Sequence, residues 1–362
     1  MKNLINPPKN LKNFPKNLKW SHNIIDYSVH DSYFVNNNKS YFLSLKVFFN
    51  FIKFFVINLT KRLIKYELIP LHVRSGKSLN LKFKFLFLAI KNTIGLKTKN
   101  FKKFSKNSIA DSMNKFGISV VKIPDQDFLD LEKISKPHFD SLLQKRSNKT
   151  SNNRDFEDSR IYANRVSSPK LFTIIEDIFE KNGIMRGASS QLGRDVKLID
   201  INPQINDKSD NFWSEIFKDK ENLKFPETAY FHRDASGGDL KAIIYLTDVS
   251  NDNGPFTFSI GSHKISISKI DDWICETNDS SGFSSTEKNK RFEFSQLPEF
   301  LRQKGSFGND LDPNSNFTKS ILESSWKITA SKGSIVLFDT KGAHRGGMVV
   351  NGQRRVITCV LG

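Results

Sequence analysis

The chain has 362 residues, a formal net charge of +18 and 12% aromatic residues, enough length and apolar content for a buried core. Its two cysteines exclude a disulfide-built scaffold and a four-cysteine zinc site, and they favour a reducing, intracellular setting. Residues 1–110 hold 21 lysines and arginines against three acidic residues, so this third carries the whole net charge and the remainder is neutral. The charge therefore marks a boundary in the chain.

The basic third begins with a Lys-, Asn- and Pro-rich stretch, residues 1–40, which predicts a loop-rich arm. Residues 41–66 predict a helix with a wide Phe-rich face and a polar stripe that includes Lys46, Asn50 and Lys53. Residues 79–97 fit either a strand or a helix. We expect no signal peptide and no membrane-spanning helix, because lysines and asparagines interrupt every apolar run.

Two interpretations of this basic third stay open. Its helices pack on the main domain with solvated lysines, or they bind an anionic membrane surface. Nucleic-acid binding is not favoured, because no recognisable binding module is present. We expect residues 1–106 to form a basic, partly helical extension and residues 107–362 to form a separate domain. The expected location is cytoplasmic, with peripheral contact to the membrane.

From residue 107 the sequence alternates between helical and extended patterns. Helices are predicted at 108–115, 128–144 and 170–181, and strands at 116–123, 195–201, 241–249, 254–263 and 333–339. Residues 348–360 predict a hairpin around Asn351-Gly352, and residues 275–325 have the composition of a polar insertion. Helices followed by many short strands favour an α+β protein whose core is a jelly roll.

A metal site is indicated by His232-Arg233-Asp234, which falls between these strands. In an extended segment, residues two apart point to the same face, so an imidazole and a carboxylate can meet at one ion. His344, which follows the predicted strand 333–339, can supply a third ligand. Two histidines and one carboxylate form the facial triad of non-haem Fe(II) oxygenases. Arg354, ten residues further on, suits a clamp on a carboxylate.

These residues lie within longer motifs. The motifs are Phe231-His-Arg-Asp234, Tyr245-Leu-Thr-Asp-Val249, Asn253-Gly-Pro-Phe-Thr-Phe-Ser-Ile-Gly-Ser-His-Lys264, Gly333-Ser-Ile-Val-Leu-Phe-Asp339, His344-Arg-Gly-Gly347 and Gly352-Gln-Arg-Arg-Val-Ile-Thr358. Together they resemble the phytanoyl-CoA dioxygenase family of Fe(II)/2-oxoglutarate oxygenases over about residues 107–362. The resemblance implies a double-stranded β-helix (jelly-roll) core with N-terminal flanking helices.

The resemblance also implies His232, Asp234 and His344 as Fe(II) ligands and a basic residue on the cosubstrate 2-oxoglutarate. Arg354 and Arg355 compete for that last role. The local Gly-x-Arg pattern favours Arg354, whereas a regular hairpin at Asn351-Gly352 would place Arg355 on the face of His344 unless Gly346-Gly347 bulges.

The implied reaction uses O₂ to hydroxylate a small-molecule or lipid-like substrate while 2-oxoglutarate becomes succinate and CO₂. Related halogenases lack the carboxylate, so Asp234 favours hydroxylation. The alternative is a catalytically inactive jelly-roll scaffold with a membrane-associating basic arm.

Other chemically suggestive residues have a simpler interpretation. Lys241 and Tyr245 could point toward the cosubstrate, but their strand positions favour a structural role. His263 lies in a Gly-Ser-His-Lys turn and is not expected to bind metal. Packing roles are expected for Cys359, Trp213, Trp273 and Trp326.

Overall fold

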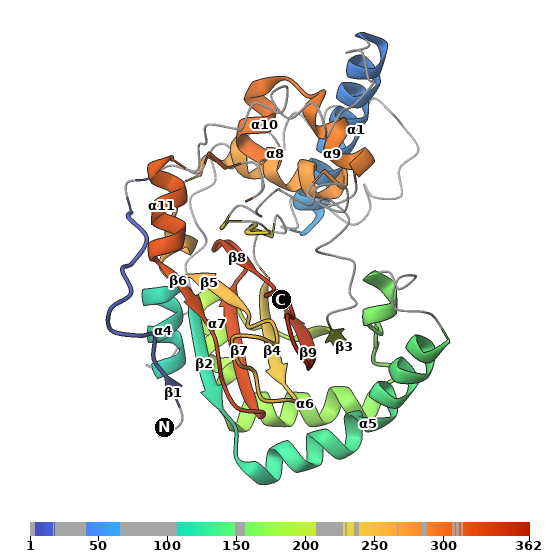
Figure 1. Cartoon of the computed structure of the whole chain (residues 1–362), viewed down its shortest axis with the longest axis vertical. Helices are drawn as coiled ribbons and strands as arrows, with labels where there is room; N and C mark the ends of the chain where they lie inside the picture. The colour runs from blue at the N-terminus through green and yellow to red at the C-terminus, as the bar shows by residue number, and fades with distance from the viewer. Residues whose placement is uncertain are drawn as a thin grey trace.

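The computed structural model describes residues 4–16, 18, 41–65, 107–148, 156–207, 227–228, 230–234, 239–265, 267–283, 288–305, 308, 311–312 and 314–362. The ambiguous segment 79–97, Trp213 and most of the predicted arm lie outside these residues. Within them, helices and two antiparallel sheets form a mixed α and β structure (Figure 1).

The large sheet has six strands in the order β1-β2-β7-β4-β9-β3, and every neighbouring pair is antiparallel. Its centre is apolar and β-branched, as in the Ile118-Ser-Val-Val run of β2, which suits a buried pleated surface. The strands are β1 (Leu4–Ile5), β2 (Ile118–Lys122), β3 (Leu198–Asp207), β4 (Leu240–Tyr245), β7 (Ser334–Asp339) and β9 (Gln353–Leu361).

The small sheet has three strands in the order β6-β5-β8. They are β5 (Thr257–Ser259), β6 (Ser325–Lys327) and β8 (His344–Arg345). His232 extends this sheet, because it forms an antiparallel bridge with His344 on the free side of β8. The segments of the two sheets interleave along the chain, in the order β3, His232, β4, β5, β6, β7, β8 and β9. Of these, β3, β4, β7 and β9 belong to the large sheet, and the other four belong to the small one. Eight segments shared in this way between two antiparallel sheets match the strand arrangement of a double-sheet jelly roll.

The two faces of the large sheet have different partners. Ile335 and Leu337 of β7 pack with the helices, whereas the alternating Val336 and Phe338 pack with Phe258 of the small sheet. The helix layer comprises α4 (Ser108–Phe116), α5 (Asp125–Ser147), α6 (Pro169–Lys181) and α7 (Ile184–Leu192). The space between the sheets is thus a second core, and it is the side on which the predicted ligands lie.

A separate helical cluster lies beyond the small sheet, at the top of Figure 1. It combines α1 (Tyr41–Lys65) with α8 (Lys269–Ser280), α9 (Lys288–Ser295) and α10 (Glu299–Gly305). Val47 and Phe51 of α1 are buried there against Ile274, Phe283 and Phe294. The segment 275–325 therefore contains the end of α8 together with α9, α10 and α11 (Asn316–Glu323), which its polar composition did not predict.

Most predicted elements agree in position with the structure, including the helix at 41–66, but the predicted hairpin at 348–360 is wrong. Val349 bridges to Asn253, and the amides of Val350 and Asn351 donate to the carbonyl of Asp252. The chain crosses from the small sheet to the large one at Asn351-Gly352, so β8 and β9 never pair. A turn that joins two sheets favours the same residue types as a hairpin turn, such as a glycine with positive φ, and Gly352 has φ 75°. The Asn351-Gly352 pair therefore predicts a turn but not the strands that it connects.

Helix α1 is 25 residues long, but among the described residues no helix has the length and apolar content needed to cross a membrane.

Candidate metal centre

The structure brings His232, Asp234 and His344 together, with one potential ligand atom from each within 4.8 Å of the others. The two histidines face each other on adjacent strands, and each backbone amide donates to the other's carbonyl at 2.9 Å. The Asp234 amide donates to the Thr340 carbonyl, so residues 232–234 stay extended beside the chain that leads into β8. The carboxylate thereby shares a face with His232, as the spacing predicts.

Backbone carbonyls fix the tautomer of both imidazoles. The Nδ1 atom of His232 lies 2.9 Å from the Tyr230 carbonyl, and that of His344 lies 2.8 Å from the Gly342 carbonyl. Because a carbonyl can only accept, each Nδ1 carries a proton, and in the neutral ring Nε2 then presents a lone pair. The Nε2 atoms lie 3.5 Å and 3.7 Å from the nearer Asp234 carboxylate oxygen. Three donors therefore converge on one position, in the manner of metal-ligating histidines.

Burial and charge set the protonation of these side chains. Burial, with the charge of His232, lowers the pKa of His344 to about 3, so this imidazole is neutral at pH 7. Burial alone would lower the pKa of His232, but the hydrogen bond and charge of Asp234 outweigh it and raise that pKa. Burial would raise the pKa of the Asp234 carboxyl, but Lys241 and then the two histidines hold it well below its ordinary value.

The cluster is closed on one side and open on the other. The side chain of His344 is 4% exposed, with its ring 4.9 Å from that of Phe338 and 5.7 Å from that of Phe256, measured between centroids. The side chain of His232 is 32% exposed. A ligand would therefore approach past His232.

A fourth polar side chain, and a charged one, belongs to the cluster, and the sequence analysis expected only a structural role for it. The Lys241 ammonium lies 2.6 Å from Oδ2 of Asp234. Lys241 precedes Ile243 and Tyr245 at two-residue spacing on β4, and Tyr245 is fully buried between the sheets. The signal in the sequence was this period-two alternation, which puts a lysine on an otherwise apolar inner face.

The two candidate arginines lie on opposite faces of β9. Arg354 is 8% exposed and shares the inner face with Val356, and its Nη2 donates to Asn206 Oδ1 at 3.3 Å. Arg355 shares the other face with the helix-facing residues Ile357 and Cys359, and its Nε donates to Gln353 Oε1 at 2.8 Å. Arg354 is therefore the arginine on the same side of the sheet as the triad.

The remaining residues singled out in the sequence have packing surroundings. The Tyr245 hydroxyl donates to the Ile328 carbonyl at 3.1 Å and accepts from the Phe256 amide at 3.3 Å. His263 lies against Gly117 and is not one of the three clustered ligands. Cys359 is buried on the helix side of the large sheet, and burial raises the pKa of its thiol. Trp326 packs between the sheets, and Trp273 makes an edge contact with Phe55 of α1.

The segment before His232 is held in an unusual conformation. Tyr230 has φ 64°, in the left-handed region that side-chain-bearing residues rarely adopt. The Gly308 amide donates to the Phe231 carbonyl at 2.7 Å, and Thr228 Oγ1 donates to the Gly308 carbonyl at 2.8 Å. A Cβ at Gly308 would overlap the Thr228 carbonyl oxygen, so the close approach requires glycine.

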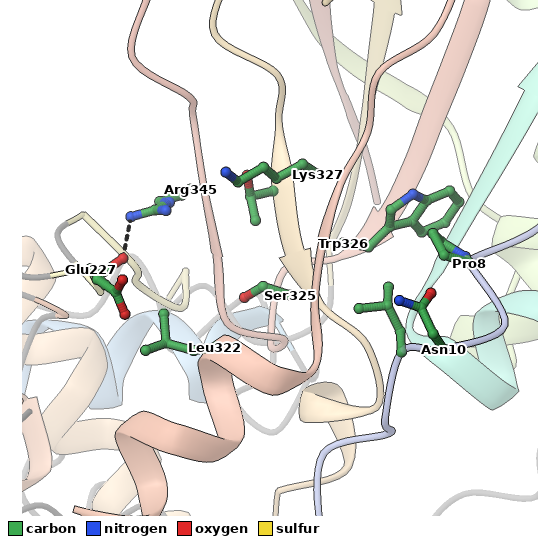
Figure 2. A pocket seen from close by; sticks show the side chains of 10 residues that line it. Pro8, Asn10, Glu227, Leu322, Ser325, Trp326, Lys327 and Arg345 are labelled. Carbon is green, nitrogen blue, oxygen red and sulfur yellow. Dashed lines mark hydrogen bonds between the residues drawn. The ribbon is translucent and has the colours of Figure 1, made fainter. Parts of the chain in front are cut away.

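A cavity of about 600 Å³ lies beside the small sheet, between β6, α11 and residues 8–11 of the N-terminal arm (Figure 2). Arg345 and Lys327 contribute its cationic groups. Because Arg345 follows His344 on β8, its side chain leaves the opposite face of the sheet. Its Nη1 donates to the Glu227 carbonyl at 2.8 Å, and its guanidinium lies 4.5 Å from the Phe231 ring centroid. This cavity is therefore separate from the triad, and Arg345 anchors the segment that leads to His232.

No family model matches the chain, and no curated protein matches its sequence. Among solved structures, the chain is similar to EctD from S. alaskensis in its apoform, with 11% identity, a TM-score of 0.41, and coverage of 74% of this chain and 79% of that chain. It is also similar to the non-heme alpha ketoglutarate dependent carbocyclase SnoK from nogalamycin biosynthesis, with 13% identity, a TM-score of 0.40, and coverage of 71% and 84%. A third is AviO1 from Streptomyces viridochromogenes, with 12% identity, a TM-score of 0.39, and coverage of 72% and 95%. Likenesses at this level do not assign a function to the chain.

Proposed function

We propose that this chain is an Fe(II)- and 2-oxoglutarate-dependent oxygenase of the phytanoyl-CoA dioxygenase type, acting on a small-molecule or lipid-like substrate by hydroxylation. The observation that carries the proposal is the convergence of His232 Nε2, His344 Nε2 and the Asp234 carboxylate within 4.8 Å. Two imidazole nitrogens and one carboxylate oxygen are the donor set of non-haem Fe(II) oxygenases, which keep further positions open.

The donor set fits the metal in its chemistry as well as its spacing. The carbonyls of Tyr230 and Gly342 hold both histidines in the tautomer that presents Nε2. His344 is neutral, as a ligand must be, and Asp234 is ionised. His232, Asp234 and His344 would therefore hold Fe(II). When bound, an Fe(II) centre of this class uses 2-oxoglutarate to activate O₂, giving succinate, CO₂ and a hydroxylated product.

The protein's own part is to bind and orient the cosubstrate. Arg354 lies on the inner face of β9, and its guanidinium suits a two-point contact with a carboxylate. We propose that Arg354 binds the carboxylate of 2-oxoglutarate that lies remote from the metal. The apolar inner face around Tyr245, Phe256 and Phe338 excludes water from the buried, His344 side of the cluster.

The proposal is tested by anaerobic titration of the full chain with Fe(II) and 2-oxoglutarate. We expect a metal-to-ligand charge-transfer band in the visible that is absent from Asp234→Ala and His344→Ala, since each variant keeps only two ligands. A metabolite screen for an oxygen-dependent gain of one oxygen atom then identifies the substrate. A wild-type chain that gives no such band would favour the inactive scaffold instead.

A further inference from the structure

Lys241 places a fixed positive charge beside the proposed metal ligands. Its Nζ lies 2.6 Å from Asp234 Oδ2, and its side chain is 32% exposed. β4 is held on both sides, with Lys241 opposite Phe338 of β7 and Val360 of β9. The ammonium therefore projects from a strand in the middle of the large sheet, and it has limited freedom to leave the cluster.

The ammonium cancels the charge of the carboxylate it contacts. The Asp234 carboxylate supplies one negative charge, and the Lys241 ammonium beside it supplies one positive charge. A divalent cation on the triad would then lie close to the ammonium. Like charges a few ångströms apart repel each other. A carboxylate-bearing ligand bound next to the ion would supply negative charge to both cations.

We propose that Lys241 couples metal binding to the binding of an anionic chelating ligand, so that each strengthens the other. The inference rests on the proposed function, because it places the ion on the triad. It assigns Lys241 a positioning role with two parts: it binds Oδ2 and leaves Oδ1 of Asp234 directed at His232, and it disfavours the ion in the absence of the anion. Such coupling is reciprocal, so the ion must raise affinity for the anion by the same factor.

The test measures binding of Mn(II) to the full, metal-stripped chain without O₂, with and without 2-oxoglutarate, at one fixed pH. In the wild type we expect 2-oxoglutarate to raise Mn(II) affinity. In Lys241→Met we expect Mn(II) alone to bind about tenfold more tightly, and the enhancement by 2-oxoglutarate to shrink about tenfold. Lys241→Arg retains the charge and should keep the wild-type pattern.

A second variant separates charge from polarity. Lys241→Gln keeps a polar side chain beside Asp234 but carries no charge, so it should behave like Lys241→Met. If circular dichroism shows that Lys241→Met does not fold, Lys241→Gln takes its place as the neutral variant. An undiminished enhancement in the neutral variants overturns the role of Lys241 while leaving the metal site intact. A wild-type chain that binds no Mn(II) overturns the metal site itself and the coupling with it.

Discussion

At the scale of single residues, the role proposed for Arg354 makes a direct prediction. Replacing Arg354 with Ala should remove a charge-assisted contact with 2-oxoglutarate of about 1.5–3 kcal/mol, which is roughly a 10- to 150-fold loss of affinity. Arg355→Ala is the matched control, because that side chain lies on the helix side of β9. Isothermal titration of each variant with 2-oxoglutarate in the presence of Mn(II) measures the difference. A larger loss in the Arg355 variant would contradict the assignment.

The cysteines provide a second test at this scale. Cys275 Sγ donates to the Lys304 carbonyl, joining α8 to α10. Burial raises the pKa of the Cys275 thiol to about 12. Since the thiolate is the reactive form, neither Cys275 nor the buried Cys359 should react readily with a thiol reagent at pH 8.

The check is a time course with a chromogenic disulfide reagent, with a fully denatured sample as the control for two reactive thiols. Rapid modification of one thiol in the folded chain would show that α8 and α10 open there.

Among the elements, the segment before His232 is the most sensitive to a small change. Gly308→Ala should force the Thr228 carbonyl to move, and we expect a loss of about 1–3 kcal/mol in the free energy of unfolding. Metal affinity should fall with it, because Gly308 is hydrogen-bonded to Phe231, the residue next to His232.

The control is Gly346→Ala, where an added Cβ would lie 4.0 Å from the nearest atom, Nη2 of Arg354. Denaturant titration and Mn(II) binding are measured on both variants. Equal effects in the two would contradict the role given to Gly308.

Helix α1 offers a matched pair of phenylalanines. Phe51 is 1% exposed and Phe49 is 66% exposed. Phe51→Ala should destabilise the protein by about 3–5 kcal/mol, whereas Phe49→Ala should change stability by less than about 0.5 kcal/mol. Thermal or urea unfolding of the full-length variants distinguishes them, and a small effect at Phe51 would mean that α1 contributes little to the folded protein.

Regular elements were predictable where the sequence holds a short apolar run or a clear helical period. The apolar run of 333–339 and the helical spacing of 41–66 predicted β7 and α1. α8 to α10 were missed, because the polar residues of 275–305 hide a few buried side chains such as Phe283 and Phe294. Local spacing also predicted part of the candidate site, because the His-x-Asp pattern places His232 and Asp234 on one face. The hairpin prediction failed because no local pattern indicates which sheet a strand joins.

For the whole molecule, the described parts of the N-terminal third make contacts across the fold. β1 pairs with β2, the Phe14 amide donates to the Ile260 carbonyl, and Asn58 of α1 donates to the Glu276 carbonyl and Ser280 Oγ. The division of the chain at residue 106 stays a prediction. These contacts favour the interpretation in which α1 packs on the rest of the protein.

A 107–362 fragment should therefore be less soluble and less stable than the full chain, because it leaves Ile274, Phe283 and Phe294 without α1. Gel filtration and thermal unfolding of the two proteins provide the measurement. A fragment as stable and monodisperse as the full chain would contradict this expectation.

Membrane binding is a separate proposal for the basic third, and it is motivated by the +18 charge. Exposed Phe49, Ile52 and Val56 lie near Lys46 and Lys53 on α1. We expect the full chain to float with anionic liposomes at low salt and to be released as salt rises. Neutral liposomes are the control, and failure to float with anionic lipid at low salt would end the proposal.

The bridge between His232 and His344 has a consequence for unfolding. The two residues are far apart in the chain but directly opposite each other on adjacent strands. An ion held by both would act as a reversible cross-link that closes a long loop, and it would bind the native chain in preference to the unfolded one. At a free concentration of about 100 times its dissociation constant, such an ion raises the free energy of unfolding by about 2.7 kcal/mol. Chelation should then increase proteolysis of the segments before His232 and after β7, so that iron supply would govern the lifetime of the protein as well as its activity.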